Sequence, residues 1–173
     1  MEVIDNFLPD TFFKDLQTLM MGYYFPWYYN NFTVGSDVIR QDEIYKVKKK
    51  SLYQFVHTFY DIRSPWNGVA SDLCNNVEPV CEFLRVNRLY RIKANLNPRS
   101  IVHRSTGWHT DGFDCPKTAV FYLNTNNGYT KFKKGGKIKS VENRIIIFDS
   151  NKEHAGYTCT NENTRVVMNF NYA

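Results

Sequence analysis

Two histidines and one aspartate are the residues of this sequence best suited to hold a metal ion. His109 and Asp111 are separated by one residue within the stretch 107–112. If that stretch is extended, both side chains point to the same side, because side chains alternate along an extended chain. His154 follows the apolar stretch 145–148, where a sheet could bring it beside the first pair. Two imidazoles and one carboxylate leave coordination positions open, which suits Fe(II) and its cosubstrates, while a zinc hydrolase needs a similar set.

Arg165 is a candidate to bind an anion at the same site. It lies near the start of the strand-like segment 164–172, in which Arg165, Asn169 and Asn171 alternate with apolar residues. This alternation predicts one packed face and one polar face. A guanidinium deep in a barrel needs an anionic partner, since an unpaired buried charge is costly, and a dicarboxylic cosubstrate would supply one. The alternative is an arginine in solvent or in a surface ion pair.

The hydrophobic pattern changes its period near residue 85. Apolar residues at helical spacing predict helices at 11–21 and 52–59, and a third at 73–84 that Pro79 would bend or shorten. After residue 85 the pattern predicts an antiparallel sandwich or barrel. Its expected strands are 86–96, 118–124, 144–149 and 164–172. We therefore expect a single domain, 1–173, with a helical support region at 1–84 and a β core at 85–173.

Composition excludes several classes of protein. The 173 residues are 43% hydrophobic, 16% aromatic and 23% charged, which is too apolar for a disordered chain. No apolar run of membrane-spanning length occurs, so we expect a soluble, cytoplasmic protein without a membrane partner. The four cysteines form no CxxC pair and predict free thiols. The net charge of +5 could favour an anionic partner.

An ordered series of segments resembles a known family, the 2-oxoglutarate and Fe(II)-dependent oxygenases. Within that family the sequence is similar to the small prolyl-4-hydroxylase-like type of bacteria and phages, over residues 85–172. One departure is Asn127, where the first glycine of the family's Gly-Gly-x-Thr-x-Phe segment is usual. The segments, in chain order, are His109-x-Asp111, Phe121-Tyr122-Leu123-Asn124, Gly128-Tyr129-Thr130-Lys131-Phe132, Arg144 to Phe148, His154 and Arg165.

The resemblance implies a fold and a set of binding residues. The fold would be a double-stranded β-helix, or jelly roll (cupin-like), with helices packed on its outer sheet. Fe(II) would be bound by His109, Asp111 and His154, with dioxygen as oxidant and ascorbate as an optional reductant. Arg165 would pair with the distal carboxylate of 2-oxoglutarate, which Tyr122 would also contact. Four further residues are expected, by strand parity or position, to face the cosubstrate pocket: Thr118, Thr130, Asn169 and Asn95.

The implied reaction is hydroxylation of an unactivated C–H bond, with succinate and CO2 as coproducts. Asp111 supports hydroxylation, because halogenating relatives lack this carboxylate. The implied substrate is a peptidyl proline or another amino-acid residue. The aromatic segment 23–32 could form a groove for such a peptide, or could simply cover the outer sheet.

Other functions remain open on the sequence alone. The substrate could be a free amino acid or a small metabolite. A nucleic-acid demethylase of the same superfamily would fit the lysine-rich loop 131–139, but such enzymes carry a second arginine where this chain has Asn171. A metal-dependent hydrolase would have no need of a buried Arg165. A non-catalytic jelly-roll module would have no need of the intact metal-binding set. The oligomeric state is left undetermined.

Overall fold

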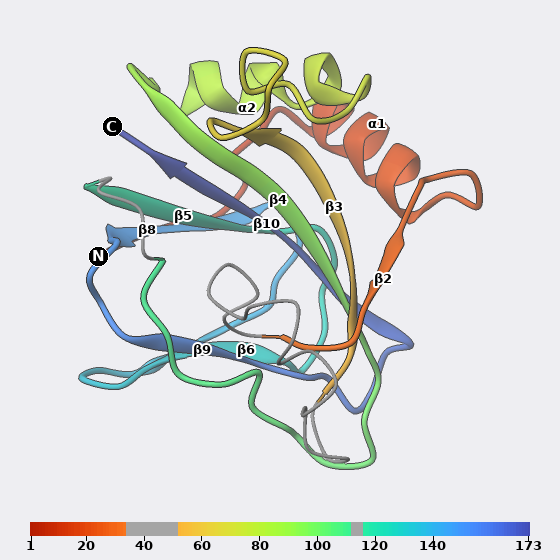
Figure 1. Ribbon diagram of the computed structural model, residues 1–173. Helices are drawn as coiled ribbons and strands as arrows, with labels where there is room; N and C mark the ends of the chain where they lie inside the picture. Colours follow the sequence, from red (N-terminus) through yellow and green to blue (C-terminus); the bar gives the residue numbers. More distant parts are fainter. Residues whose placement is uncertain (34–51, 112–115) are drawn as a thin grey trace, which may run out of the picture.

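Two antiparallel sheets face each other, and helices cover the outer side of the larger one (Figure 1). The computed structural model describes residues 1–33, 52–111 and 116–173. The helical elements are α1 (Asp10–Met21), the 3-10 turn η2 (Cys74–Asn76) and α2 (Glu78–Phe83). The strands are β1 (Glu2–Ile4), β2 (Tyr28–Asn30), β3 (Gln54–Asp61), β4 (Leu89–Pro98), β5 (Lys117–Tyr122), β6 (Tyr129–Phe132), β7 (Lys137–Lys139), β8 (Arg144–Asp149), β9 (His154–Tyr157) and β10 (Thr164–Tyr172).

The larger sheet has the strand order β1-β8-β5-β10-β4-β3-β2, and the smaller sheet has the order β7-β6-β9. Every pairing between these strands is antiparallel. Two facing antiparallel sheets with helices on one outer face form the jelly-roll architecture that the resemblance implies. The predicted fold class is confirmed.

The last strand, β10, separates two hydrophobic clusters. Its residues Val166, Met168, Phe170 and Tyr172 belong to the main core, which also contains the buried side of α1. Val167 belongs to a second cluster with residues of β5, β6 and β8. The polar side chains of β10 therefore face the interior between the sheets rather than solvent, and Arg165 and Asn171 are buried there.

The expected helix at 52–59 is wrong, because these residues form β3 and its approach. The apolar residues Phe55, Val56 and Phe59 stand at helical spacing, yet β3 pairs with β2 on one side and β4 on the other. A register shift between Thr58 and Tyr60 further obscures the strand's period of two. Strands with packing on both faces carry apolar residues on both, so spacing alone did not identify this one.

The third expected helix, 73–84, is split. It consists of η2 and the short α2, and Pro79 lies in the first turn of α2. Proline is tolerated there because the first amides of a helix have no partner within it. The helix expected at 11–21 is confirmed as α1. The larger sheet thus takes β1, β2 and β3 from the region expected to be only helical support.

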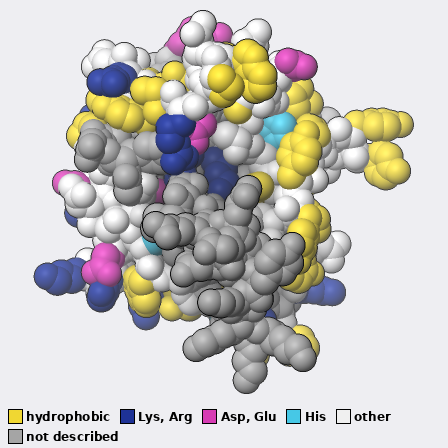
Figure 2. Space-filling view, in the orientation of Figure 1, with side chains coloured by type: hydrophobic (Ala, Val, Ile, Leu, Met, Phe, Trp, Pro, Cys, Tyr) yellow, Lys and Arg dark blue, Asp and Glu magenta, His cyan; other side chains and the backbone are white. Residues whose placement is uncertain are grey.

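The aromatic segment 23–32 has both buried and solvent-exposed side chains. Phe25 is buried in the main core, whereas Tyr23 and Tyr24 are 93% and 92% exposed. Tyr28 lines a groove of about 930 Å³ together with Trp66 and other residues. Figure 2 shows exposed hydrophobic side chains gathered along the edge where β2 lies in Figure 1.

The described part of the chain contains no membrane-spanning helix and no disulfide bond. None of its helices combines the length and the apolar character needed to cross a membrane. Cys74, Cys81 and Cys159 are free thiols, as expected, while Cys115 lies outside the described residues.

Candidate metal centre

Two backbone hydrogen bonds hold His109 and His154 side by side. The amide of each residue donates to the carbonyl of the other, with N···O distances of 3.0 and 2.9 Å. The ring centroids are 4.4 Å apart. A turn connects β8 to β9, and in it the Lys152 amide donates to the Asp149 carbonyl. His154 begins β9 and packs against Phe148, so its ring is held between the sheets.

Both imidazoles leave Nε2 free to bind a metal. The Nδ1 atom of His109 lies 3.1 Å from the Gly107 carbonyl, and that of His154 lies 2.9 Å from the Lys152 carbonyl. A carbonyl only accepts, so Nδ1 carries the proton and Nε2 keeps its lone pair. Burial lowers the pKa of His154, and the neighbouring His109 acts in the same direction, while Asp111 opposes them. A neutral imidazole, the form that binds metals, is therefore favoured at His154.

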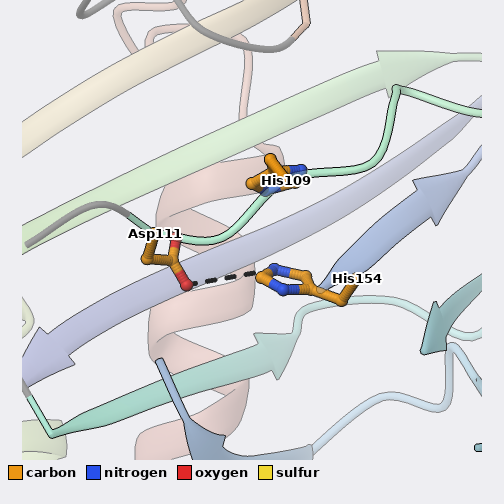
Figure 3. A group of neighbouring side chains, drawn as sticks. All are labelled: His109, Asp111 and His154. Carbon is orange, nitrogen blue, oxygen red and sulfur yellow. Dashed lines mark ion pairs between the residues drawn. The ribbon is translucent and has the colours of Figure 1, made fainter. Parts of the chain in front are cut away.

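Asp111 faces the same point as the two histidines (Figure 3). Its buried carboxylate places Oδ2 3.9 Å from His154 Nε2. The Asp111 amide donates to the Ser150 carbonyl at 3.4 Å, which ties this segment to the turn before β9. The spacing of one residue between His109 and Asp111 thus brings both side chains to one place, as expected.

The donor set fits a divalent transition-metal ion. One ligand atom from each of His109, Asp111 and His154 lies within 4.8 Å of the others. Nitrogen and oxygen ligands bind such an ion at about 2.0–2.2 Å, so neighbouring ligands of one ion are about 3 Å apart and opposite ligands about 4.4 Å. The 3.9 Å between Asp111 Oδ2 and His154 Nε2 lies between these two values. Two histidines and one carboxylate with open positions are typical of non-haem Fe(II) sites.

Arg165 forms the centre of a second buried polar group. Its Nε donates to Ser140 Oγ at 2.9 Å, and its Nη2 donates to Thr130 Oγ1 at 3.1 Å. The hydroxyl of Tyr122 donates to the same Thr130 oxygen at 2.8 Å. The guanidinium lies 5.6 Å from the centroid of the Tyr122 ring. Three residues expected in one pocket, Arg165, Tyr122 and Thr130, are thus in contact.

The charge of Arg165 lacks a protein counter-ion in the described part of the chain. None of the carboxylates there forms an ion pair with it, although the side chain is only 3% exposed. Burial lowers the pKa of Arg165 and raises the pKa of Tyr122, so the tyrosine remains a neutral phenol. A buried cation surrounded by hydroxyl groups is suited to bind an anion, and its planar fork matches a carboxylate.

The polar group around Arg165 and the three metal-binding candidates lie at neighbouring positions of the strand pair β6–β9. Thr130 pairs with Gly156, and Phe132 pairs with His154. Two residues along a strand span about 7 Å. A Cβ at Gly156 would lie 3.5 Å from Arg165 Nη1, which places the guanidinium beside this position. Arg165 and the metal-binding histidines are therefore about two residues apart along this strand pair.

Gly128 makes room for Arg165. A Cβ at this position would lie 2.7 Å from Arg165 Cδ and 2.8 Å from the Tyr157 carbonyl oxygen, which is closer than side-chain atoms pack. In the sequence, Gly128 was recognisable only as part of the family pattern. Its role in shaping the pocket depends on distant residues.

The other expected cosubstrate residues lie in different surroundings. Thr118 Oγ1 donates to Asp111 Oδ2 at 2.6 Å, so this residue is beside the metal-binding carboxylate. Asn169 and Asn95 are half-buried, and Asn95 pairs with Val167 across β4 and β10. Their contact with a cosubstrate stays a prediction. Ser140, which binds Arg165, was not expected, since a lone serine between two short strands carries no recognisable pattern.

Comparisons with known proteins identify the fold through structure rather than sequence. No family model matches this chain, and no curated protein sequence matches it.

Three solved structures illustrate the similarity. A prolyl hydroxylase from Trichoplax adhaerens, in complex with a hypoxia inducible factor peptide fragment, is 12% identical with a TM-score of 0.60, over 99% of this chain and 82% of its own. The viral collagen prolyl hydroxylase of Paramecium Bursaria Chlorella virus-1 is 17% identical with a TM-score of 0.56, over 98% and 93%. An oxidoreductase of the 2OG-Fe(II) oxygenase family from Burkholderia pseudomallei is 13% identical with a TM-score of 0.53, over 69% and 68%.

At these identities the similarity concerns the fold alone. This structural similarity agrees with the resemblance in the sequence, and the two rest on separate observations: the fold and the ordered sequence segments. This chain has the fold of the 2-oxoglutarate/Fe(II) oxygenases.

Proposed function

We propose that this protein is a 2-oxoglutarate and Fe(II)-dependent dioxygenase that hydroxylates an unactivated C–H bond. One observation carries the proposal. His109, Asp111 and His154 converge to within 4.8 Å at one end of a strand pair, and a buried Arg165 without a described ion-pair partner lies beside the same pair. A metal site for hydrolysis accounts for the first part of this arrangement but gives the arginine no role.

The residues have distinct roles in this proposal. His109, Asp111 and His154 would hold Fe(II), and Arg165 would hold the distal carboxylate of 2-oxoglutarate. When bound, Fe(II) and 2-oxoglutarate supply the oxidising chemistry, in which dioxygen is consumed, 2-oxoglutarate becomes succinate and CO2, and one oxygen atom enters the substrate. The carbonyls of Gly107 and Lys152 keep the proton on Nδ1 of each histidine. Each ring is thereby fixed in the tautomer that binds metal through Nε2.

The chain also limits access of water to the site. Apolar side chains of the second cluster, including Phe132, Phe148 and Val167, lie between the sheets, and Phe148 packs on His154. A pocket with few waters strengthens the attraction between Arg165 and a carboxylate, because the local dielectric constant is low. Thr130 can donate its hydroxyl hydrogen to this carboxylate, and Tyr122, which donates to Thr130, fixes that hydroxyl without adding negative charge.

We assign an amino-acid residue of a peptide, most simply proline, as the substrate. Several solved structures with this fold are prolyl hydroxylases, and one of them is in complex with a peptide fragment. A free amino acid or small metabolite is the alternative that the substrate test separates. A nucleic-acid substrate would fit the net charge of +5 and the lysines of 131–139, but Asn171 stands where a second arginine would be expected.

The cofactor assignment is tested without any substrate. Anaerobic addition of Fe(II) and 2-oxoglutarate to the purified protein should give the weak visible absorption band of a 2-oxo acid bound to Fe(II). A correctly folded protein that gives no such band, and that releases no succinate in air with ascorbate present, would rule out the proposal.

The substrate assignment needs a separate test. Proline-containing peptides, free amino acids and N-methylated oligonucleotides are incubated with the loaded protein, and mass spectrometry detects the gain of one oxygen atom or the loss of a methyl group. Oxidation of peptides alone supports the proposed substrate. Oxidation of free amino acids alone, or loss of a methyl group from the oligonucleotides, would replace it.

A further inference from the structure

A chain of hydrogen bonds links Asp111 to three strands of the larger sheet. Thr118 Oγ1 donates to Asp111 Oδ2 at 2.6 Å, and Asn171 Nδ2 donates to Thr118 Oγ1 at 3.0 Å. Arg91 Nε in turn donates to Asn171 Oδ1 at 3.1 Å. Thr118 and Asn171 have no exposed surface. None of these bonds involves the nitrogen atoms that the histidines offer to a metal.

Arg91 also contacts Asp111 directly, so Arg91, Asn171, Thr118 and Asp111 form a closed ring of polar contacts. Arg91 Nη2 lies 3.5 Å from Asp111 Oδ1, and the two side chains are 11% and 3% exposed. The two oxygens of Asp111 therefore have different surroundings. Oδ2 faces His154 and accepts the Thr118 hydroxyl, whereas Oδ1 faces the guanidinium.

Strand register produces this arrangement. Arg91 on β4 lies directly opposite Asn171 on β10, and Asn171 lies directly opposite Thr118 on β5. Directly opposite residues on one face are within reach of each other's side chains. Three polar residues therefore lie in a row across the interior face of the sheet, next to the Asp111 carboxylate. They are Arg91, Asn171 and Thr118.

We propose that Arg91 is a positioning residue that keeps Asp111 a ligand through one oxygen only. A carboxylate that is free to turn can bind a metal through both oxygens and fill one more coordination position. The guanidinium holds Oδ1, and Asn171 and Thr118 fix the rotation of the group so that only Oδ2 faces the metal centre. That coordination position then stays available to the cosubstrate and dioxygen. This inference rests on the metal centre of the proposed function.

A purely structural role for Arg91 makes a different prediction. If the residue only ties β4 to β10, its replacement lowers stability but leaves the number of positions on the metal unchanged. The two roles are separated by counting water molecules on a bound ion, since a carboxylate that binds through both oxygens displaces one of them.

The experiment uses Mn(II) with the purified full chain, without 2-oxoglutarate. Affinity is measured from the electron paramagnetic resonance signal of the free ion, and bound water from the relaxation rate of water protons. Arg91→Gln should weaken Mn(II) binding about 10- to 100-fold, the usual cost of losing an outer partner of a ligand, and should lower the relaxation enhancement per bound ion. Arg91→Lys should fall between this variant and wild type, because one ammonium group cannot replace both the Nε and Nη2 contacts.

Matched variants test the rest of the ring. Thr118→Val removes the hydroxyl at nearly constant volume and should act in the same direction as Arg91→Gln, whereas Thr118→Ser should resemble wild type. Arg144→Gln is the control for loss of an arginine, since Arg144 pairs with Asp5 and not with Asp111. Thermal unfolding checks that each protein is folded. If Arg91→Gln does not fold, the comparison of Thr118→Val with Thr118→Ser tests the inference instead.

The possible results are distinct. Wild-type affinity and relaxation in Arg91→Gln and Thr118→Val would overturn the inference. So would weaker binding with an unchanged relaxation enhancement per bound ion, because Asp111 would then still bind through one oxygen. A wild-type protein that binds no Mn(II), and gives no absorption band with Fe(II) and 2-oxoglutarate, would instead overturn the proposed function on which the inference depends.

Discussion

His109 and His154 each donate a backbone hydrogen bond to the other, although 44 residues separate them in the sequence. The spacing of these two proposed ligands is therefore set by the backbone and not by side-chain packing alone. Asp111 follows on the same extended segment as His109, so one short antiparallel contact positions all three side chains. Substitution of a ligand side chain should leave this backbone contact in place.

Loss of the carboxylate ligand should abolish metal binding and turnover while preserving the fold. Asp111→Ala removes one of three protein ligands, so Fe(II) affinity should fall by more than the roughly 10- to 100-fold cost of losing an outer partner. Succinate release should become undetectable, with an unchanged circular dichroism spectrum. His103→Ala serves as control, because His103 bonds the Thr158 carbonyl away from the three ligands. Continued succinate release by Asp111→Ala would show that another carboxylate binds the metal.

Removal of the buried guanidinium should weaken cosubstrate binding more than it changes the maximum rate. A hydrogen-bonded charged group contributes about 1.5–3 kcal/mol, so Arg165→Met should raise the 2-oxoglutarate concentration for half-maximal succinate release about 10- to 100-fold. Arg63→Gln removes an arginine from a surface ion pair and should behave as wild type. A half-maximal concentration unchanged in Arg165→Met would show that Arg165 does not bind the cosubstrate.

Two glycine substitutions should differ sharply in their effect on stability. Gly128→Ala forces a methyl group to within 2.8 Å of the Tyr157 carbonyl oxygen and 2.7 Å of Arg165 Cδ, and overpacking of this kind costs about 1–3 kcal/mol. Gly136→Ala adds a methyl group with no atom within 4 Å and should change the free energy of unfolding by less than about 0.5 kcal/mol. Urea denaturation of the two variants measures this contrast. Equal stabilities would mean that the pocket wall adjusts to the added group.

Stability should fall in mild acid partly because of His57. Burial lowers the pKa of this side chain, although its contact with the Pro26 carbonyl opposes the effect. The unfolded chain therefore binds the proton more tightly. The contribution of His57 is full above its unfolded pKa of about 6.5 and is lost as the pH falls below that value toward the folded-state pKa. Urea unfolding near pH 7.5 and pH 5 should show a smaller loss in His57→Gln than in wild type, and an equal loss would assign the acid sensitivity to other groups.

The sequence predicted those elements of the fold that have one apolar face and one polar face. Alternation in β10 identified a packed face and a polar face, and α1 showed a helical stripe because one side of it faces solvent. It failed at β3, where both faces are covered and the buried set includes Gln54 and His57. Neither polar residue contributes to a hydrophobic period, so the remaining apolar positions suggested a helix.

The site was predictable where its residues are close in sequence or match a family pattern. The proposed ligands and the contact of Tyr122 with the Arg165 group follow from those signals. The ring of Arg91, Asn171 and Thr118 depends on the register of three strands, which no single segment encodes. Arg91 and Asn95 are four residues apart on β4 and share a face, but this spacing does not show which carboxylate lies there.

The hydroxyl of Thr130 determines which kind of ligand the arginine pocket can accept. Both of its lone pairs are used, one by Arg165 and one by Tyr122. Its remaining capacity is a single hydrogen to donate. A molecule that binds beside Thr130 would therefore meet hydrogen-bond donors from Thr130 and Arg165, which favours an oxygen acceptor over an ammonium group.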